Sequence, residues 1–281
     1  MSNATEPMLF RLRVAYPKVG RLKYLGHLEL IHTVEQVVRR AALPYAVTQG
    51  FSPHMRIAYT SALPVGTSSA AEYFDVYLTE LVPADLALSR LQDASPADLR
   101  PLAAAYVELR RPALTAEITR VDYLIGLAFS GGHSVTEDRL REVFTAWLNS
   151  DAGVEIPYRR GKKSKVLSLN RVLKGVQARL SADGRGWVEL KTHCDNEGSL
   201  RPEILIAALD QALRGLAPGV DEEIVSTGIQ ELVAIESFQV ERSAQWIVDD
   251  SGRVSAPLNA AFDAPDPCLS SLARSEVLSN L

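Results

Sequence analysis

The first 110 residues show hydrophobic patterns of two kinds, one with the period of a strand and one with the period of a helix. Apolar and polar side chains alternate over residues 9–16 (LFRLRVAY), which predicts a half-buried strand. Over residues 28–43 an apolar residue recurs every three or four positions, which predicts an amphipathic helix that Pro44 ends. The further expected elements are strands at 55–59, 72–79 and 102–109 and a helix at 83–94. The order β-α-β-β-α-β is that of the ferredoxin-like unit.

The same order recurs in the second half of the chain. Strands are expected at 122–129, 172–181, 187–192 and 228–235, and helices at 134–147 and 202–213, with an insertion at 155–169. We therefore predict an α+β protein of two tandem ferredoxin-like domains with antiparallel sheets. Their expected limits are 8–112 and 117–243. Residues 244–281 show little periodicity and predict a loosely structured tail, with a short hairpin around 249–253.

Composition narrows the function classes. The 281 residues are 47% hydrophobic and 23% charged, as in ordinary globular proteins. The net charge of −4 means that nucleic-acid binding would need a local basic patch. No apolar run is long enough to cross a membrane, and no signal peptide precedes the first strand, so we expect a cytoplasmic protein without a membrane partner. Cys194 and Cys268 lie too far apart in sequence to indicate an iron–sulfur or zinc module.

The segment at 50–75 combines two Gly/Pro turns with charged residues, a mixture that a core strand does not need. We expect a ligand-binding site there, formed by Gly50, Phe51, Ser52, Pro53, His54, Arg56, Glu72 and Asp75. A histidine pair beside a carboxylate can serve as acid and base, which makes His27, His54 and Glu72 the candidate catalytic residues. The alternative is that both histidines bond backbone carbonyls and hold the 50–53 loop. No metal site is predicted.

The insertion carries a second candidate site. Five cations fall within seven residues, and a tyrosine precedes them. The expected RNA-binding residues are Tyr158, Arg159, Arg160, Lys162, Lys163 and Lys165. Lysine and arginine gain affinity for phosphates by releasing counterions, and an aromatic ring can stack on a base. The alternative, a solvated loop, stays open at this point.

A third set of cations lies on and around the first strand. The set comprises Arg11, Arg13, Lys18, Arg21 and Lys23. Arg11 and Arg13 share one strand face, and charges on that face could line a groove. Arg39 and Arg40 stand at a helix end, where they complement the helix dipole.

Several motifs occur here together: Gly26-His27-Leu28-Glu29, Gly50-Phe51-Ser52-Pro53-His54, Leu63-Pro64-Val65-Gly66 and Glu72-Tyr73-x-Asp75. With them the chain resembles a domain-of-unknown-function family of bacterial proteins found beside, or fused to, radical-SAM proteins with a cobalamin-binding-like region. The resemblance covers most of residues 8–240. It implies a radical-SAM protein as partner. S-adenosylmethionine and an iron–sulfur cluster are then expected in that partner, and no cofactor in this chain.

Three functions follow from these observations. We favour a non-catalytic accessory protein that binds or presents a structured RNA substrate to a radical-SAM enzyme. The first alternative is an RNA-processing or RNA-modifying enzyme that uses His27 and His54. The second is an adaptor that binds only protein.

Overall fold

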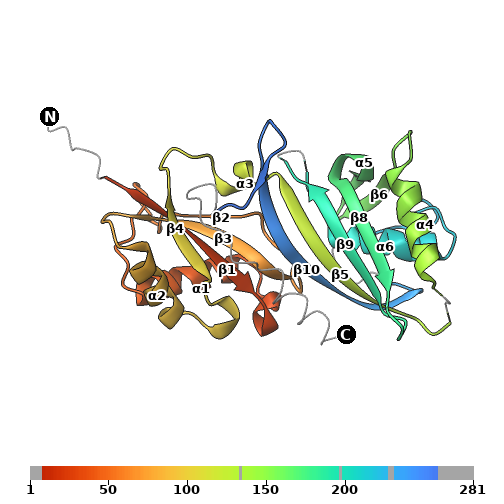
Figure 1. Cartoon of the computed structure of the whole chain (residues 1–281), viewed down its shortest axis with the longest axis horizontal. Helices are drawn as coiled ribbons and strands as arrows, with labels where there is room; N and C mark the ends of the chain where they lie inside the picture. Colours follow the sequence, from red (N-terminus) through yellow and green to blue (C-terminus); the bar gives the residue numbers. More distant parts are fainter. Residues whose placement is uncertain (1–7, 133–134, 196–197, 227–230, 259–281) are drawn as a thin grey trace. The chain divides into compact units, whose positions relative to one another are not determined.

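A computed structural model describes residues 8–132, 135–195, 198–226 and 231–258 (Figure 1). The chain divides into two compact units. Of the described residues, the first unit comprises 8–119 and 244–258, and the second comprises those between 120 and 243. Among the described residues, no helix is long and apolar enough to span a bilayer.

The first unit follows the expected order of elements. Its strands are β1 (Phe10–Lys18), β2 (Ile57–Tyr59), β3 (Ser68–Leu78), β4 (Ala103–Val107) and β11 (Val254–Ser255). Its helices are α1 (His27–Arg40), α2 (Ala84–Ala94), the short α3 (Leu114–Glu117) and the 3-10 turns η1 (Gly20–Tyr24) and η2 (Ala97–Leu99). β1 pairs antiparallel with β3 on one side and β4 on the other, and β2 pairs antiparallel with β3.

One face of this sheet forms the core of the first unit. Alternate residues of β1 and β3, among them Val14 and Phe74, pack with Val34 and Val38 of α1 and Leu91 of α2. The intervening residues point to the opposite face of the sheet, because side chains alternate along a strand. That opposite face carries the charged residues described below.

The second unit contains a four-stranded sheet and a separate hairpin. Its elements are β5 (Arg120–Phe129), α4 (Glu137–Leu148), β6 (Glu155–Arg160), β7 (Lys163–Ser168), α5 (Leu169–Val172), β8 (Leu173–Leu180), β9 (Gly186–His193), α6 (Pro202–Leu213) and β10 (Ile235–Val248), whose residues 244–248 belong to the first unit. The strand order is β10-β5-β9-β8, with β5, β9 and β8 antiparallel, and β6 pairs only with β7 among these strands. The Thr136 hydroxyl accepts from the Arg139 N–H and starts α4, and Pro202 occupies the first turn of α6.

The α+β class and the antiparallel pairing are therefore confirmed. The insertion expected at 155–169 contains the β6–β7 hairpin. One boundary was wrong. The last strand of the second unit does not span 228–235; it begins at Ile235, and residues 227–230 lie outside the described residues.

The tail expected from residue 244 is also corrected. Residues 244–248 end β10, and β10 pairs with β11 in the hairpin expected around 249–253, where the Asp249 N–H donates to Arg253 O. The sequence did not indicate a strand here because Gln245 is polar, yet it is buried in the strand. Its side-chain amide donates a hydrogen bond to Ala71 O. Residues 259–281 lie outside the described residues.

Candidate functional site

The basic run forms the two strands of the β6–β7 hairpin. Opposed pairs run from Glu155↔Ser168 to Arg160↔Lys163, and Gly161, at φ +60°, opens the two-residue turn. Directly opposed residues share a face, and alternate residues along each strand return to it. One face therefore carries Ile156 and Leu167 at its base, then Tyr158 opposite Lys165, then Arg160 opposite Lys163.

We call the outer four residues of this face, Tyr158, Arg160, Lys163 and Lys165, the basic hairpin face. Ile156 and Leu167 below them are buried and fix the hairpin to the unit. The three cations are exposed and Tyr158 is half-buried. Lys162, also exposed, sits in the turn. No carboxylate of a described residue forms an ion pair with Lys162, Lys163 or Lys165, so their charge is available to an anionic ligand.

Arg159 points to the other face and has a structural role. Its guanidinium makes two bonds to Glu223, from Nε to Oε1 at 2.8 Å and from Nη2 to Oε2 at 2.9 Å. This hydrogen bond and the charge of Arg159 hold the pKa of Glu223 below its ordinary value. The backbone of Arg159 adds two bonds to the same segment, to Ile224 O and from the Ser226 N–H. Arg159 thus fixes the hairpin against residues 223–226.

The hairpin and the start of α6 interact electrostatically, through Arg160 of β6 and Glu203 of α6. Burial raises the pKa of Glu203 above its ordinary value, while Arg201 and then Arg160 act in the opposite direction. The charge of Arg160 therefore favours the ionised form of Glu203.

The two histidines have different neighbours. His54 lies in the exposed 50–54 loop, where its Nε2 is 3.4 Å from the Ser52 hydroxyl and its backbone N–H donates to the Thr48 hydroxyl. His27 opens α1, and its ring meets the Tyr59 ring edge-on at 6.2 Å. Within the described part of the chain, no contact joins the histidines. Nor do three or more His, Cys, Asp or Glu residues there gather to hold a metal ion.

The expected carboxylates lie on opposite faces of the first unit's sheet. Glu72 is buried on the face of Phe74 and accepts from the Thr60 hydroxyl at 2.9 Å. Asp75 is fully buried on the other face. Arg56 stacks over the Tyr77 ring, 4.3 Å from its centroid. The residues predicted from 50–75 are therefore held in at least two local environments rather than one cluster.

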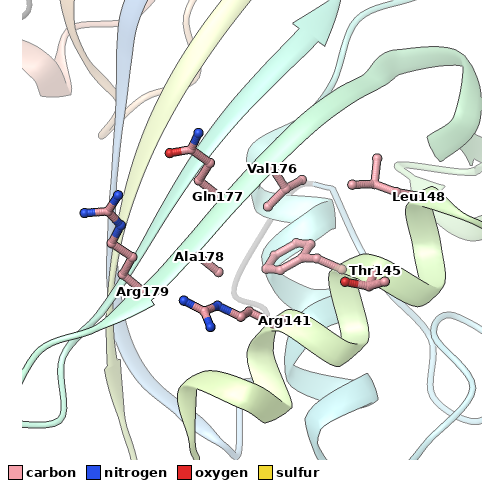
Figure 2. A pocket seen from close by; sticks show the side chains of 8 residues that line it. Arg141, Thr145, Leu148, Val176, Gln177, Ala178 and Arg179 are labelled. Atoms are coloured by element: carbon pink, nitrogen blue, oxygen red, sulfur yellow. The ribbon is translucent and has the colours of Figure 1, made fainter.

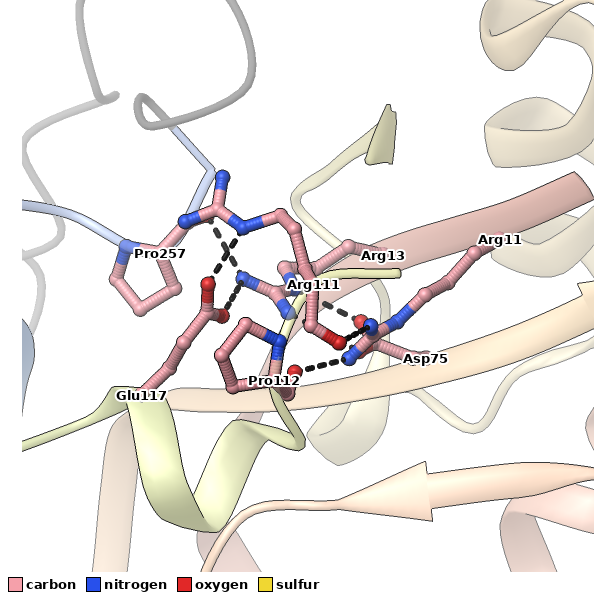
Figure 3. Close-up of polar contacts among 7 residues, drawn as sticks. All are labelled: Arg11, Arg13, Asp75, Arg111, Pro112, Glu117 and Pro257. Atoms are coloured by element: carbon pink, nitrogen blue, oxygen red, sulfur yellow. Dashed lines mark hydrogen bonds and ion pairs between the residues drawn. The ribbon is translucent and has the colours of Figure 1, made fainter. Parts of the chain in front are cut away.

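Asp75 is the centre of a buried ion cluster (Figure 3). Arg11 Nε reaches its Oδ2 at 2.8 Å, and Arg13 Nε reaches its Oδ1 at 2.8 Å. Arg13 Nη1 also pairs with Glu117 of α3 at 2.9 Å. Burial lowers the pKa of Arg13, but its bonds to Asp75 and the charge of Glu117 outweigh this and raise it.

This cluster corrects the expectation that Arg11 and Arg13 line a groove. Both are buried, because the chain after β4 covers their face: Arg11 donates to the carbonyl oxygens of Arg111 and Pro112, and Arg13 donates to Pro257 O. Lys18 is buried as well, and its Nζ donates to Lys23 O and Leu25 O. These cations hold loops in place and are not open to a ligand.

A family model described as "Uncharacterized protein conserved in bacteria (DUF2344)" matches residues 11–202. The chain belongs to this family. The matched region of this DUF2344 protein includes the whole of the first-unit motif segment and the basic hairpin. No curated protein matches the sequence at a significant level.

One solved structure carries the provisional name of a glycine cleavage system transcriptional repressor. Its sequence is 9% identical to that of the DUF2344 protein. The match covers 83% of the DUF2344 protein and 98% of the solved chain, with a TM-score of 0.22. A TM-score this low supports no conclusion about fold or function.

Proposed function

We propose that this DUF2344 protein is a non-catalytic, cytoplasmic accessory protein of a radical-SAM system that binds or presents a structured RNA. One observation carries the RNA part: the β6–β7 hairpin places Tyr158 and three cations on one face, while Arg159 is held apart by Glu223. The partnership rests on the motif resemblance alone. In this proposal S-adenosylmethionine and the iron–sulfur cluster belong to the partner.

The chemistry of the basic hairpin face favours RNA. The protein has a net charge of −4, so these exposed cations form the kind of local patch that phosphate binding requires. Tyr158 offers a ring beside the cations, on which a base can stack. Proteins read RNA mainly in loops, bulges and single-stranded ends, where bases are free to stack on side chains. A loop of a structured RNA is therefore the ligand that this face would take.

We infer that both units are ferredoxin-like and stand in tandem along the chain. Support comes from the strand orders, which place β1 between β4 and β3 with β2 beyond, and β5 between β10 and β9 with β8 beyond. In each unit the four strands and two long helices alternate as β-α-β-β-α-β once the β6–β7 hairpin is set aside.

The proposal is tested by anaerobic affinity purification of the protein from its native host, with and without RNase. Two charge-reversed forms are compared: Lys163→Glu/Lys165→Glu on the basic hairpin face, and Arg90→Glu/Lys191→Glu at exposed positions elsewhere. We expect a discrete RNA and a radical-SAM protein to co-purify, with the RNA lost only from the hairpin variant. Equal RNA recovery from both variants would contradict the RNA-binding site.

The same experiment separates the alternative functions. A partner protein that survives RNase without any enriched RNA would favour the protein-only adaptor. RNA turnover by the purified, partner-free protein that His54→Ala abolishes would favour the enzyme. The contacts of His27 and His54 give the enzyme no specific support, because the two rings meet different residues.

A further inference from the structure

The second unit carries a pocket lined by none of the hairpin residues. The pocket has a volume of about 390 Å³ and opens between α4 and β8 (Figure 2). Phe144 and Leu148 of α4 and Val176 of β8 form its apolar wall, and its two charged lining residues, Arg141 and Arg179, are both cationic. The volume lies within the range of ligand-binding pockets.

The pocket borders an unpaired strand edge. β8 is the last strand of its sheet, and within the described ranges no strand pairs with its outer side. The Leu180 N–H points to that side, because it donates to Glu137 Oε2 at 2.8 Å. Backbone polar groups alternate in direction along a strand, so the N–H and C=O groups of Val176 and Ala178 point outward too. Such an edge is a template for another strand.

The strand also dictates which side chains a bound segment needs. All four residues from Val176 to Arg179 border the pocket, but the side chains of Val176 and Ala178 point toward α4, whereas those of Gln177 and Arg179 point to the other side of β8 (Figure 2). A segment paired with β8 continues this alternation across the strand. Its residues on the pocket side meet an apolar wall, and those on the other side lie beside Arg179.

The exposed arginines indicate that the bound segment's side chains beside Arg179 should be acidic. Arg179 is exposed and has no carboxylate partner among the described residues. Arg141 pairs with Glu137, yet 57% of its side chain stays exposed at the pocket. We propose that the β8 edge and this pocket bind an extended segment of another protein in which apolar and acidic residues alternate, by β-augmentation. The backbone edge supplies affinity, and the pocket and Arg179 supply selectivity.

The test uses a fluorescein-labelled nine-residue peptide of alternating Glu and Val, and the full chain. A peptide with Lys in place of Glu is the matched ligand control. Thr145→Trp places a large ring in the pocket, and Ala146→Trp, at the next exposed helix position outside the lining, is the matched protein control. Fluorescence anisotropy measures affinity, and hydrogen exchange reports the amides of Val176 and Ala178.

We expect the acidic peptide to bind at least about tenfold more tightly than the Lys peptide, since electrostatic and steric complementarity each contribute selectivity. Thr145→Trp should weaken binding by about tenfold or more, and Ala146→Trp should leave it unchanged. Bound peptide should slow exchange at Val176 and Ala178. Arg179→Glu, which leaves the apolar wall of the pocket unchanged, should reverse the preference toward the Lys peptide.

Three results would overturn the proposal. The first is absence of binding, or equal affinity for both peptides. The second is a dimer in light scattering that Thr145→Trp dissociates, because the occupant would then be a second copy of this chain. The third is peptide binding that occurs only after residues 259–281 are removed, because the chain would then occupy its own edge.

Discussion

Arg159 and Glu223 form a bidentate ion pair, with donor–acceptor distances of 2.8 and 2.9 Å. This pair removes one of the five cations of the basic run from contact with a ligand. We expect Glu223→Gln to release it, so that Arg159 becomes free to meet a phosphate. Each added phosphate contact steepens the dependence of log K on log salt by about 0.7 to 0.9. RNA affinity measured at several salt concentrations should show a slope steeper by about that amount, and an unchanged slope would show that the released Arg159 makes no phosphate contact.

The Asp75 cluster allows a second prediction. Asp75→Asn leaves Arg11 and Arg13 buried without their shared counter-charge. Breaking a buried pair by removing one partner costs about 3–5 kcal/mol. We expect a loss of that size in the free energy of unfolding, measured by urea denaturation. Asp93→Asn, at an exposed position of α2, should change it by less than about 0.5 kcal/mol. A loss below about 1 kcal/mol for Asp75→Asn would contradict the buried cluster.

Tyr59 gives a prediction with a pH dependence. Its hydroxyl is buried and makes no hydrogen bond to a described residue. Burial, and then the charge of Glu35, raises the pKa of Tyr59 above its ordinary value. The unfolded chain therefore loses this proton first, so stability is retained below pH ~10 and falls as the pH rises above it.

We expect Tyr59→Phe to be neutral or stabilising at pH 8, because no hydrogen bond is lost. Raising the pH from 8 to 10.5 should then lower the urea midpoint of the variant less than that of the native protein. If the variant instead loses more than about 1 kcal/mol at pH 8, the hydroxyl has a bonding partner and this interpretation is wrong.

Two glycines provide a test of how the hairpin is held. Gly219, at φ +71°, lies against β6, and a Cβ there would come within 2.2 Å of Pro157 O. Gly184, at φ +81°, has open space around it. Gly184→Ala should cost only the backbone strain of about 1–3 kcal/mol. Gly219→Ala should cost more, since the clash with backbone adds about 1–3 kcal/mol. Equal unfolding free energies for the two variants would contradict this packing.

The periodic elements could be predicted from the sequence because one face of each is buried. The helix predicted at 202–213 has the same bounds as α6, and Pro202 marks its first turn. The hairpin could also have been found: Gly161 is the first of two turn residues between the strands, the position that a type II′ turn reserves for glycine. The density of charge hid the strand alternation.

The buried charges could not be predicted in this way. Arg11, Arg13 and Asp75 alternate with apolar residues as solvent-facing side chains do, and they are buried because residues 111–117 and Pro257 lie over them. Gln245 is hidden by the same effect, since its partner Ala71 is distant in sequence. Local periodicity carries no information about a second layer supplied by a remote segment.

The salt dependence of RNA binding is the sharpest test of whether the basic hairpin face contacts RNA. A small structured RNA enriched from the host is titrated with purified native protein, with Lys163→Glu/Lys165→Glu and with Arg90→Glu/Lys191→Glu, from about 50 to 200 mM salt. We expect the native and control proteins to share one affinity and one slope. The hairpin variant should bind more weakly, and its slope should be smaller by an amount that corresponds to about two phosphate contacts. Binding by all three proteins with the same slope would contradict the basic hairpin face as the RNA site.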